Sequence, residues 1–190
     1  MSDPPGWITR WRVRAGYPAA LGFLAFARPA PITLEAGAIV AAIGLCVRGY
    51  AAGYLYKHET LATAGPYAWT RNPLYLGSVI LAAGIGIAGG SWLAAIPLAI
   101  YFLVFYPGVM RREEAELRAH YGTAFEEYAR RVPLFWPRLP RHRPSAPPVE
   151  TMGPAGFSWT QYRRNREYQA AAGAVLGFAV LVAVMFVIRR

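Results

Sequence analysis

The chain has 190 residues, of which 55% are hydrophobic and only 16% are charged, with a formal net charge of +10. Soluble domains usually carry about 25% charged residues, so this composition, with a mean hydropathy of +0.25, argues against a soluble domain. The basic residues flank apolar runs, as do Arg10, Arg12 and Arg14. This pattern indicates the ends of membrane helices rather than a nucleic-acid-binding face. Cys46 is the only cysteine, which excludes an internal disulfide, and no zinc-ligand spacing occurs.

Apolar stretches follow one another along the chain and predict an all-α, polytopic membrane protein with about five transmembrane helices. They cover about residues 13–27, 32–56, 74–88, 92–109 and 168–188. The first stretch is short, because a span needs about 20 residues. Gly89 and Gly90 turn the chain between the third and fourth stretches, so we expect these two to form an antiparallel helical hairpin.

This pattern divides the chain into four parts. They are an N-terminal segment with the first short span (1–32), a membrane core (33–139), a proline-rich and basic linker (140–167) and a C-terminal apolar helix (168–190). We expect an integral protein of a bacterial-type inner membrane.

Basic residues favour the cytoplasmic side of a membrane. They place the N-terminus, residues 57–71, 111–143 and 163–166 in the cytoplasm, and the Gly89–Gly90 turn outside. With five crossings, the basic pair at 189–190 falls outside, against the same rule.

The hairpin returns the chain to the face from which it started, and this predicts a cluster of polar side chains. We expect the first set to lie near the second: Tyr67, Arg71, Asn72 and Tyr75, near Arg112, Glu113, Glu114, Tyr128 and Arg131. Asn72-Pro73 predicts a helix start with proline in the first turn, whose free amides can donate to a ligand. Glu113 or Glu114 can accept from hydroxyls or pair with an ammonium group, and Arg71 or Arg131 can hold a carboxylate.

Each of these residues taken alone has a plainer interpretation. Gly-Pro-Tyr is usually only a turn, the arginines are most often interfacial anchors, and paired glutamates usually form a solvated helix face with weak ion pairs. Arg48 is the least ordinary, because a charge within a membrane helix is expensive, although it could extend to the cytoplasmic edge. The joint order of the motifs is much more specific than any one of them.

In order, the motifs read Gly65-Pro66-Tyr67, Arg71-Asn72-Pro73-Leu74-Tyr75-Leu76-Gly77, Glu113-Glu114-Ala115-Glu116-Leu117, Tyr121-Gly122, Phe125 to Tyr128, and Val132-Pro133 to Pro137. This order, with a hairpin between the second and third motifs, resembles the isoprenylcysteine carboxyl methyltransferase and phospholipid methyltransferase superfamily of membrane enzymes. The resemblance covers roughly residues 33–139. The chain continues about 50 residues beyond Pro140, with a segment at 159–168 that has no counterpart in the family pattern.

The resemblance implies S-adenosylmethionine-dependent methyl transfer to a lipophilic acceptor, with the cofactor in a cytoplasmic pocket. It implies these cofactor-binding residues: His58, Leu61, Gly65, Tyr67, Arg71, Asn72, Pro73, Tyr75 and Glu114. Arg131 would orient a carboxylate acceptor, whereas Glu113 or Glu114 would accept a proton from an amine acceptor. Asn72 stands where the family's Arg-His-Pro form has histidine, and its amide cannot titrate near neutral pH. No metal site is expected.

Several functions stay open at this point. An isoprenylcysteine-like carboxylate is the leading acceptor, followed by a phospholipid amine and then a small thiol. A sterol-type reductase with a nicotinamide cofactor is disfavoured because the chain has too few spans. The non-enzyme alternative is a membrane scaffold or channel subunit, which would show no affinity for an S-adenosyl ligand. Expected partners are a lipophilic or lipid substrate and the membrane lipids, without nucleic acid.

Overall fold

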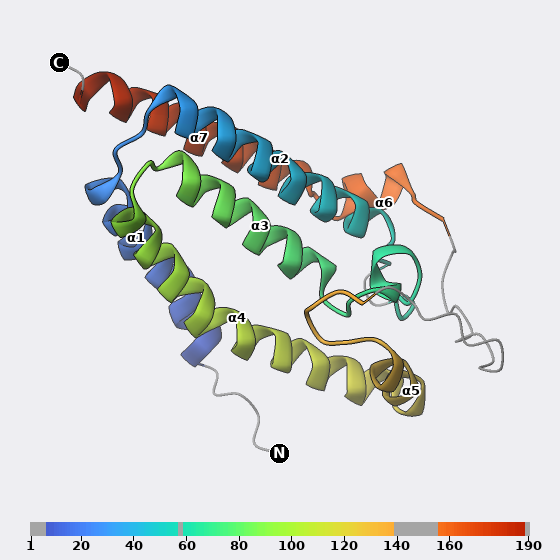
Figure 1. The fold of residues 1–190 in the computed structure, drawn as a ribbon. Coiled ribbons are helices and arrows are strands. Elements are labelled where there is room, and N and C mark those ends of the chain that lie inside the picture. The colour runs from blue at the N-terminus through green and yellow to red at the C-terminus, as the bar shows by residue number, and fades with distance from the viewer. Residues whose placement is uncertain (1–6, 57–58, 139–155, 189–190) are drawn as a thin grey trace.

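A computed structural model describes residues 7–56, 59–138 and 156–188. Within these ranges every regular element is a helix (Figure 1), which confirms the all-α prediction. The helices are α1 (Trp7–Phe26), α2 (Pro31–Gly53), the short 3-10 helix η1 (Gly65–Ala68), α3 (Pro73–Ala88), α4 (Trp92–Tyr121), α5 (Thr123–Arg131), α6 (Trp159–Arg164) and α7 (Tyr168–Ile188).

Three of these helices, α2, α4 and α7, are long and apolar enough to cross a membrane. Helix α3 is apolar but has only 16 residues, and the sequence of α1 carries three arginines in its first half. The integral membrane character is therefore supported by three helices of the predicted five.

Helix α4 is longer than its apolar stretch. It runs unbroken for 30 residues, or about 45 Å at 1.5 Å per residue, whereas the hydrocarbon core of a bilayer is about 30 Å thick. About 20 residues from Trp92 the sequence becomes polar, at Arg111. Helix α4 is therefore longer than one bilayer crossing requires, and its polar final turns carry Glu113 and Glu114 on the same rigid element as the apolar stretch.

Helices α2 and α3 pack backbone against backbone. A Cβ added to Gly84 of α3 would lie 2.4 Å from the Ala41 nitrogen, and one added to Gly44 of α2 would lie 2.7 Å from the Gly77 carbonyl oxygen. Small residues let membrane helices approach this closely, and the resulting van der Waals contact holds them together. The closely packed α2–α3 pair therefore fixes the positions of the two helix ends between which the polar segment with η1 lies.

The connections at the two ends of the bundle differ in character. Figure 1 shows the α1–α2 connection and the α3–α4 turn at one end, where Phe23, Ala27, Ala88, Ala94 and Leu181 form an apolar cluster. At the opposite end lie the C-terminal end of α2, η1, the start of α3, the end of α4, α5 and α6. This arrangement confirms that the α3–α4 hairpin returns the chain to the face that carries the Gly-Pro-Tyr and Arg-Asn-Pro motifs.

Candidate active site

The segment between η1 and α3 pairs with the segment that leaves α5. The Arg71 amide donates to the Pro133 carbonyl at 2.9 Å, and the Arg138 amide donates to the Trp69 carbonyl at 3.0 Å. The prolines on both sides prevent either segment from being helical, and each therefore meets its backbone hydrogen-bonding needs from the other. The Arg-Asn-Pro motif and the Val-Pro motif at the end of the core are thus joined directly.

Two side chains reinforce this pairing. Thr70 is 2% exposed. Its hydroxyl donates to the Phe135 carbonyl at 2.9 Å and lies 3.3 Å from the Leu134 carbonyl oxygen. The Asn72 side-chain amide donates to the Leu134 carbonyl at 3.0 Å. Asn72 is therefore buried at the predicted site, where its NH2 group holds the backbone of the opposite segment. Sequence analysis missed Thr70, because a threonine that binds a backbone carbonyl leaves no pattern in the sequence.

An ion pair joins the two arms of the hairpin at this end. Arg71 Nη1 lies 2.6 Å from Glu114 Oε1, and the two side chains are only 14% and 16% exposed. Within the described residues, Arg71 Nε is buried and has no hydrogen-bond partner, and Glu114 Oε1 is buried with Arg71 Nη1 as its ion-pair partner. Unsatisfied buried polar atoms are uncommon in native proteins and call for an explanation such as a bound ligand. The pair thus offers Arg71 Nε as a free donor and an ion-paired carboxylate that can accept a further hydrogen bond.

Two buried phenols lie beside the ion pair. The Tyr128 hydroxyl donates to the Tyr67 carbonyl at 2.7 Å. Burial raises the pKa of the Tyr67 phenol, and the neighbouring Tyr128 and Glu113 raise it further. Burial also raises the pKa of Tyr128, although the Arg71 guanidinium partly opposes this effect. Both phenols are therefore neutral hydrogen-bonding groups at physiological pH.

Leu61 and Gly65 give this end of the molecule its shape. Leu61 is buried in an apolar cluster with Phe125, Tyr128 and Val132, so it anchors the chain beneath α5. Gly65 begins η1 with φ +58°, a conformation that favours glycine, and a Cβ there would lie 2.7 Å from the ring of Tyr54.

The other predicted residues occupy different positions around the cluster. Pro73 is buried in the first turn of α3, as predicted. The Tyr75 ring meets the Tyr106 ring of α4 edge to face, with 5.3 Å between centroids. Glu113 is exposed on α4. His58 lies outside the described residues.

Arg131 lies near the cluster because it is close in sequence to a residue that contacts Arg71. It lies two residues before Pro133, whose carbonyl accepts from Arg71. Its guanidinium pairs with Glu127, one turn earlier on α5, and its side chain is 32% exposed. The structure thus brings together Arg71, Glu114 and the two tyrosines, with Arg131 at the partly exposed edge of α5.

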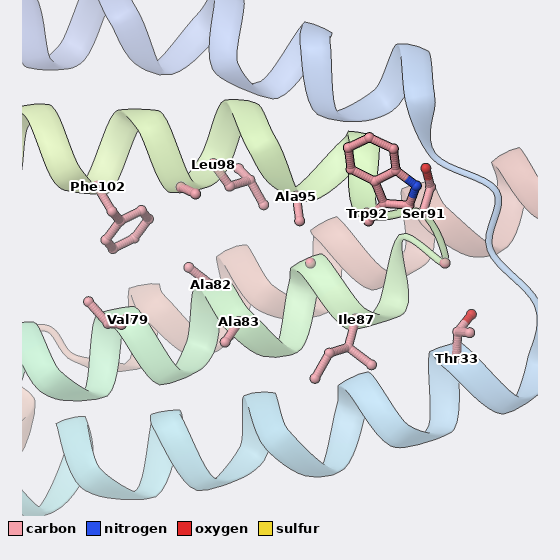
Figure 2. Close-up of a pocket in the computed structure, with 13 residues that line it drawn as sticks. Thr33, Val79, Ala82, Ala83, Ile87, Ser91, Trp92, Ala95, Leu98 and Phe102 are labelled. Atoms are coloured by element: carbon pink, nitrogen blue, oxygen red, sulfur yellow. The ribbon is translucent and has the colours of Figure 1, made fainter.

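A groove runs between α3 and α4 on the bundle side of the Tyr75–Tyr106 contact. It has a volume of about 580 Å³, within the range of small-molecule pockets, and small or apolar side chains line it. Figure 2 shows Val79 and Ala82 of α3 facing Leu98 and Phe102 of α4 across this space. Val79 lies one turn after Tyr75 on α3, and Phe102 lies one turn before Tyr106 on α4. The groove therefore ends next to the Tyr75–Tyr106 contact and leads toward the polar cluster.

The geometry defines a helical membrane core whose polar cluster is built from both arms of a hairpin. Residues 33–124 match the family model described as phospholipid methyltransferase. The chain is 36% identical over 115 residues to a cobalt-zinc-cadmium resistance protein, CzcN, of Cupriavidus metallidurans, covering 60% of this chain and 53% of that protein. It is 30% identical over 122 residues to the protein-S-isoprenylcysteine O-methyltransferase of Schizosaccharomyces pombe, covering 64% of this chain and 50% of that enzyme.

A third relative is the human protein-S-isoprenylcysteine O-methyltransferase, 27% identical over 113 residues, which are 53% of this chain and 40% of the enzyme. The chain spans about half the length of the curated relatives it matches. No solved structure matches it significantly. In the described part of the chain, no group of three or more His, Cys, Asp or Glu residues could hold a metal ion.

These matches support the superfamily that the motifs indicate. Residues 33–124 are similar to the phospholipid methyltransferase family, and the methyltransferases named among the relatives support an enzymatic role for this superfamily. Methyltransferases of this kind generally depend on S-adenosylmethionine. The matched residues contain both arms of the α3–α4 hairpin, Arg71 and Glu114.

Proposed function

We propose that the protein is an integral membrane methyltransferase that moves a methyl group from S-adenosylmethionine to a lipophilic acceptor, most like the carboxylate of an isoprenylcysteine. The observation that carries the proposal is the Arg71–Glu114 pair, which leaves the buried Arg71 Nε donor without a partner at the meeting point of the core motifs. Relatives named as isoprenylcysteine O-methyltransferases favour this acceptor over a phospholipid amine.

The residues of the cluster fit the polar groups of S-adenosylmethionine. Bound cofactor supplies a methyl sulfonium that is already activated for displacement. Arg71 Nε can donate to a carboxylate, and Glu114 Oε1 can accept from a hydroxyl or an ammonium group. The neutral phenol of Tyr67 can hydrogen-bond without adding charge, while Gly65, Leu61 and Pro73 shape the surrounding backbone. We assign Asn72 and Tyr75 to the same binding region.

The acceptor would be held by a polar edge and an apolar groove. Arg131 can orient a carboxylate through its guanidinium, and a carboxylate acceptor needs no general base. An amine acceptor would instead have to lose a proton, which Glu113 or Glu114 could take. The α3–α4 groove is apolar along its length and suits the hydrocarbon part of a lipophilic acceptor. Alignment of acceptor and cofactor in a site without water is the main contribution this chain would make to the rate.

We also propose that the polar end faces the cytoplasm, with α1 and α3 completing five crossings. The same end carries Arg71, the arginines of α5 and those of α6, and basic residues favour the cytoplasmic side. Water-soluble cofactor would then enter from the cytoplasm while the acceptor arrives within the bilayer.

The activity is tested by transfer of a labelled methyl group to three acceptors in lipid vesicles: an S-farnesylcysteine, phosphatidylethanolamine and a small thiol. We expect label in the methyl ester of S-farnesylcysteine, from which alkaline hydrolysis releases the label as methanol. Glu114→Gln should reduce this transfer at least tenfold. Glu116→Gln is the matched control, since Glu116 lies on the same helix in an exposed pair with Arg112. Label in the amine alone would replace the proposed acceptor, and no transfer by folded protein to any acceptor would overturn the proposal.

The role of Arg131 is tested separately with Arg131→Ala. We expect kcat/KM for the carboxylate acceptor to fall about 10- to 100-fold, because one charge-assisted hydrogen bond contributes about 1.5–3 kcal/mol. Arg130→Ala removes an exposed neighbour on the same helix and should leave kcat/KM unchanged. Full turnover by Arg131→Ala would rule out the orienting role.

A further inference from the structure

Residues 156–167 lie beyond the family-matched core, yet they dock on the C-terminal end of α2. The Ser158 amide donates to the Gly53 carbonyl at 3.0 Å. The Asn165 side chain donates to the carbonyls of Ala52 at 2.9 Å and Leu55 at 2.8 Å. Helix C-termini leave their last carbonyls without intrahelical partners, so Asn165 acts as a cap delivered from more than 100 residues away in the sequence.

This docking places one acidic side chain inside the molecule. Glu167 is 9% exposed, and its carboxylate oxygen lies 2.5 Å from Arg48 Nε. The same guanidinium donates to the Ser78 hydroxyl and approaches the Leu74 carbonyl at 3.4 Å. One ion pair therefore links α2, the first turns of α3 and the chain between α6 and α7.

The position of this ion pair connects it to the candidate active site. Leu74 and Ser78 flank Tyr75 on α3, and Leu74 follows the buried Asn72-Pro73 start of that helix. The charges of Glu167 and Arg48 also act on the Tyr67 phenol, whose pKa burial raises. The Arg48–Glu167 pair thus borders the part of the cluster formed by Tyr67 and the first turns of α3.

The neighbouring contacts explain why the arrangement needs both partners. A Cβ on Gly77 would lie 2.6 Å from Arg48 Cγ, so the arginine stem fills the space that this glycine leaves. The Arg48 side chain is only 21% exposed, and its guanidinium without the carboxylate would be a largely uncompensated charge. Glu167 therefore fixes the direction in which Arg48 points, and Arg48 in turn holds the start of α3.

We propose that Glu167 is a positioning residue of the cofactor site, which it supports by holding Arg48 against Leu74 and Ser78 and thereby fixing the first turn of α3. The inference rests on the proposed function, because it concerns the site that would bind the cofactor. It assigns the C-terminal segment a part in building that site, in addition to adding a membrane helix.

The test compares Glu167→Gln, Arg48→Gln and the double variant with wild type. We would measure the dissociation constant of S-adenosylhomocysteine, the unfolding midpoint in mixed micelles and amide exchange in the first turns of α3. Arg164→Gln is the matched control, since Arg164 pairs with Glu59 from the same docked segment while both side chains are largely exposed. This control should leave all three measurements unchanged.

Glu167→Gln should weaken ligand binding about tenfold, speed exchange in α3 and lower the unfolding midpoint. The double variant removes the unpaired charge, so its midpoint should return close to wild type while binding remains weak and exchange remains fast. A double variant that binds like wild type, or an α3 exchange rate unaffected by Glu167→Gln, would overturn the positioning role. Wild type that folds but binds no ligand would instead overturn the proposed function and this inference with it.

Discussion

Gly77 closes the Arg-Asn-Pro motif, and its substitution by alanine tests the close contact between α2 and α3. A Cβ at this position would lie 2.6 Å from Arg48 Cγ and 2.8 Å from the Gly44 carbonyl oxygen. Carbon–oxygen contacts are ordinarily about 3.3 Å or longer, so the second contact is short by about 0.5 Å. The arginine stem can move, but the Gly44 oxygen belongs to the backbone of α2, and the two helices would have to separate.

We expect Gly77→Ala to lower the free energy of unfolding by about 1–3 kcal/mol, the usual cost of inserting a methyl group into a filled interior. Titration with SDS in mixed micelles measures this change. Displacement of Arg48 should also weaken binding of S-adenosylhomocysteine, which calorimetry measures on the fraction that stays folded.

Gly86→Ala is the control, because it makes the same change in the same helix where space is available. Its nearest neighbour would be the Ala95 methyl group at 3.7 Å, an ordinary contact. Alanine is favoured over glycine in a helix by up to about 1 kcal/mol, so this variant should be as stable as wild type or more so. If Gly77→Ala unfolds at the same SDS fraction as Gly86→Ala, the close packing of α2 on α3 is wrong.

Three further perturbations test the site and the groove. Thr70→Val keeps the shape of the buried side chain but removes the hydroxyl that donates to the Phe135 carbonyl, and should lower the free energy of unfolding by about 1–3 kcal/mol in the same SDS titration. Because burial raises the folded-state pKa of Tyr67 and Tyr128 above the unfolded value of about 10, their contribution to stability is complete below about pH 10 and is lost as pH rises toward the folded-state pKa. Unfolding followed from pH 8 to 11 should therefore show a steeper loss in wild type than in Tyr128→Phe, and equal slopes would contradict the burial of Tyr128. Ala82→Phe narrows the α3–α4 groove and should reduce kcat/KM for a long-chain acceptor without changing the affinity for S-adenosylhomocysteine. Ala179→Phe, at an exposed position of α7, is the control and should change neither quantity.

The arrangement of the hairpin could be predicted because it depends on local patterns. Gly89-Gly90 indicates a tight turn, and Asn72-Pro73 indicates a helix start, and both occur where predicted. Once two apolar helices are joined by a short turn, their outer ends must meet. The proximity of Arg71 to Glu114 followed from this geometry, although the sequence could not show that the two would form a pair at 2.6 Å.

Other parts of the site depend on contacts that have no sequence pattern. Thr70 binds carbonyl groups, which every residue carries, so no neighbouring residue identifies its role. Arg48 stood out as a charge in an apolar helix, but its partner Glu167 lies 119 residues away in a segment without a family counterpart. Helix α4 continues past Arg111 because the polar residues after it have good helix propensity, so hydropathy marks the end of the span rather than the end of the helix.

Binding of S-adenosylhomocysteine to the purified protein in lipid and detergent, measured by calorimetry, tests the central claim most directly. Wild type and Glu116→Gln should bind with the same affinity. Glu114→Gln should bind at least tenfold more weakly, because it removes a charge-assisted hydrogen bond worth about 1.5–3 kcal/mol. Equal binding by Glu114→Gln, or no binding by folded wild type, would contradict the assignment of the Arg71–Glu114 cluster as the cofactor site.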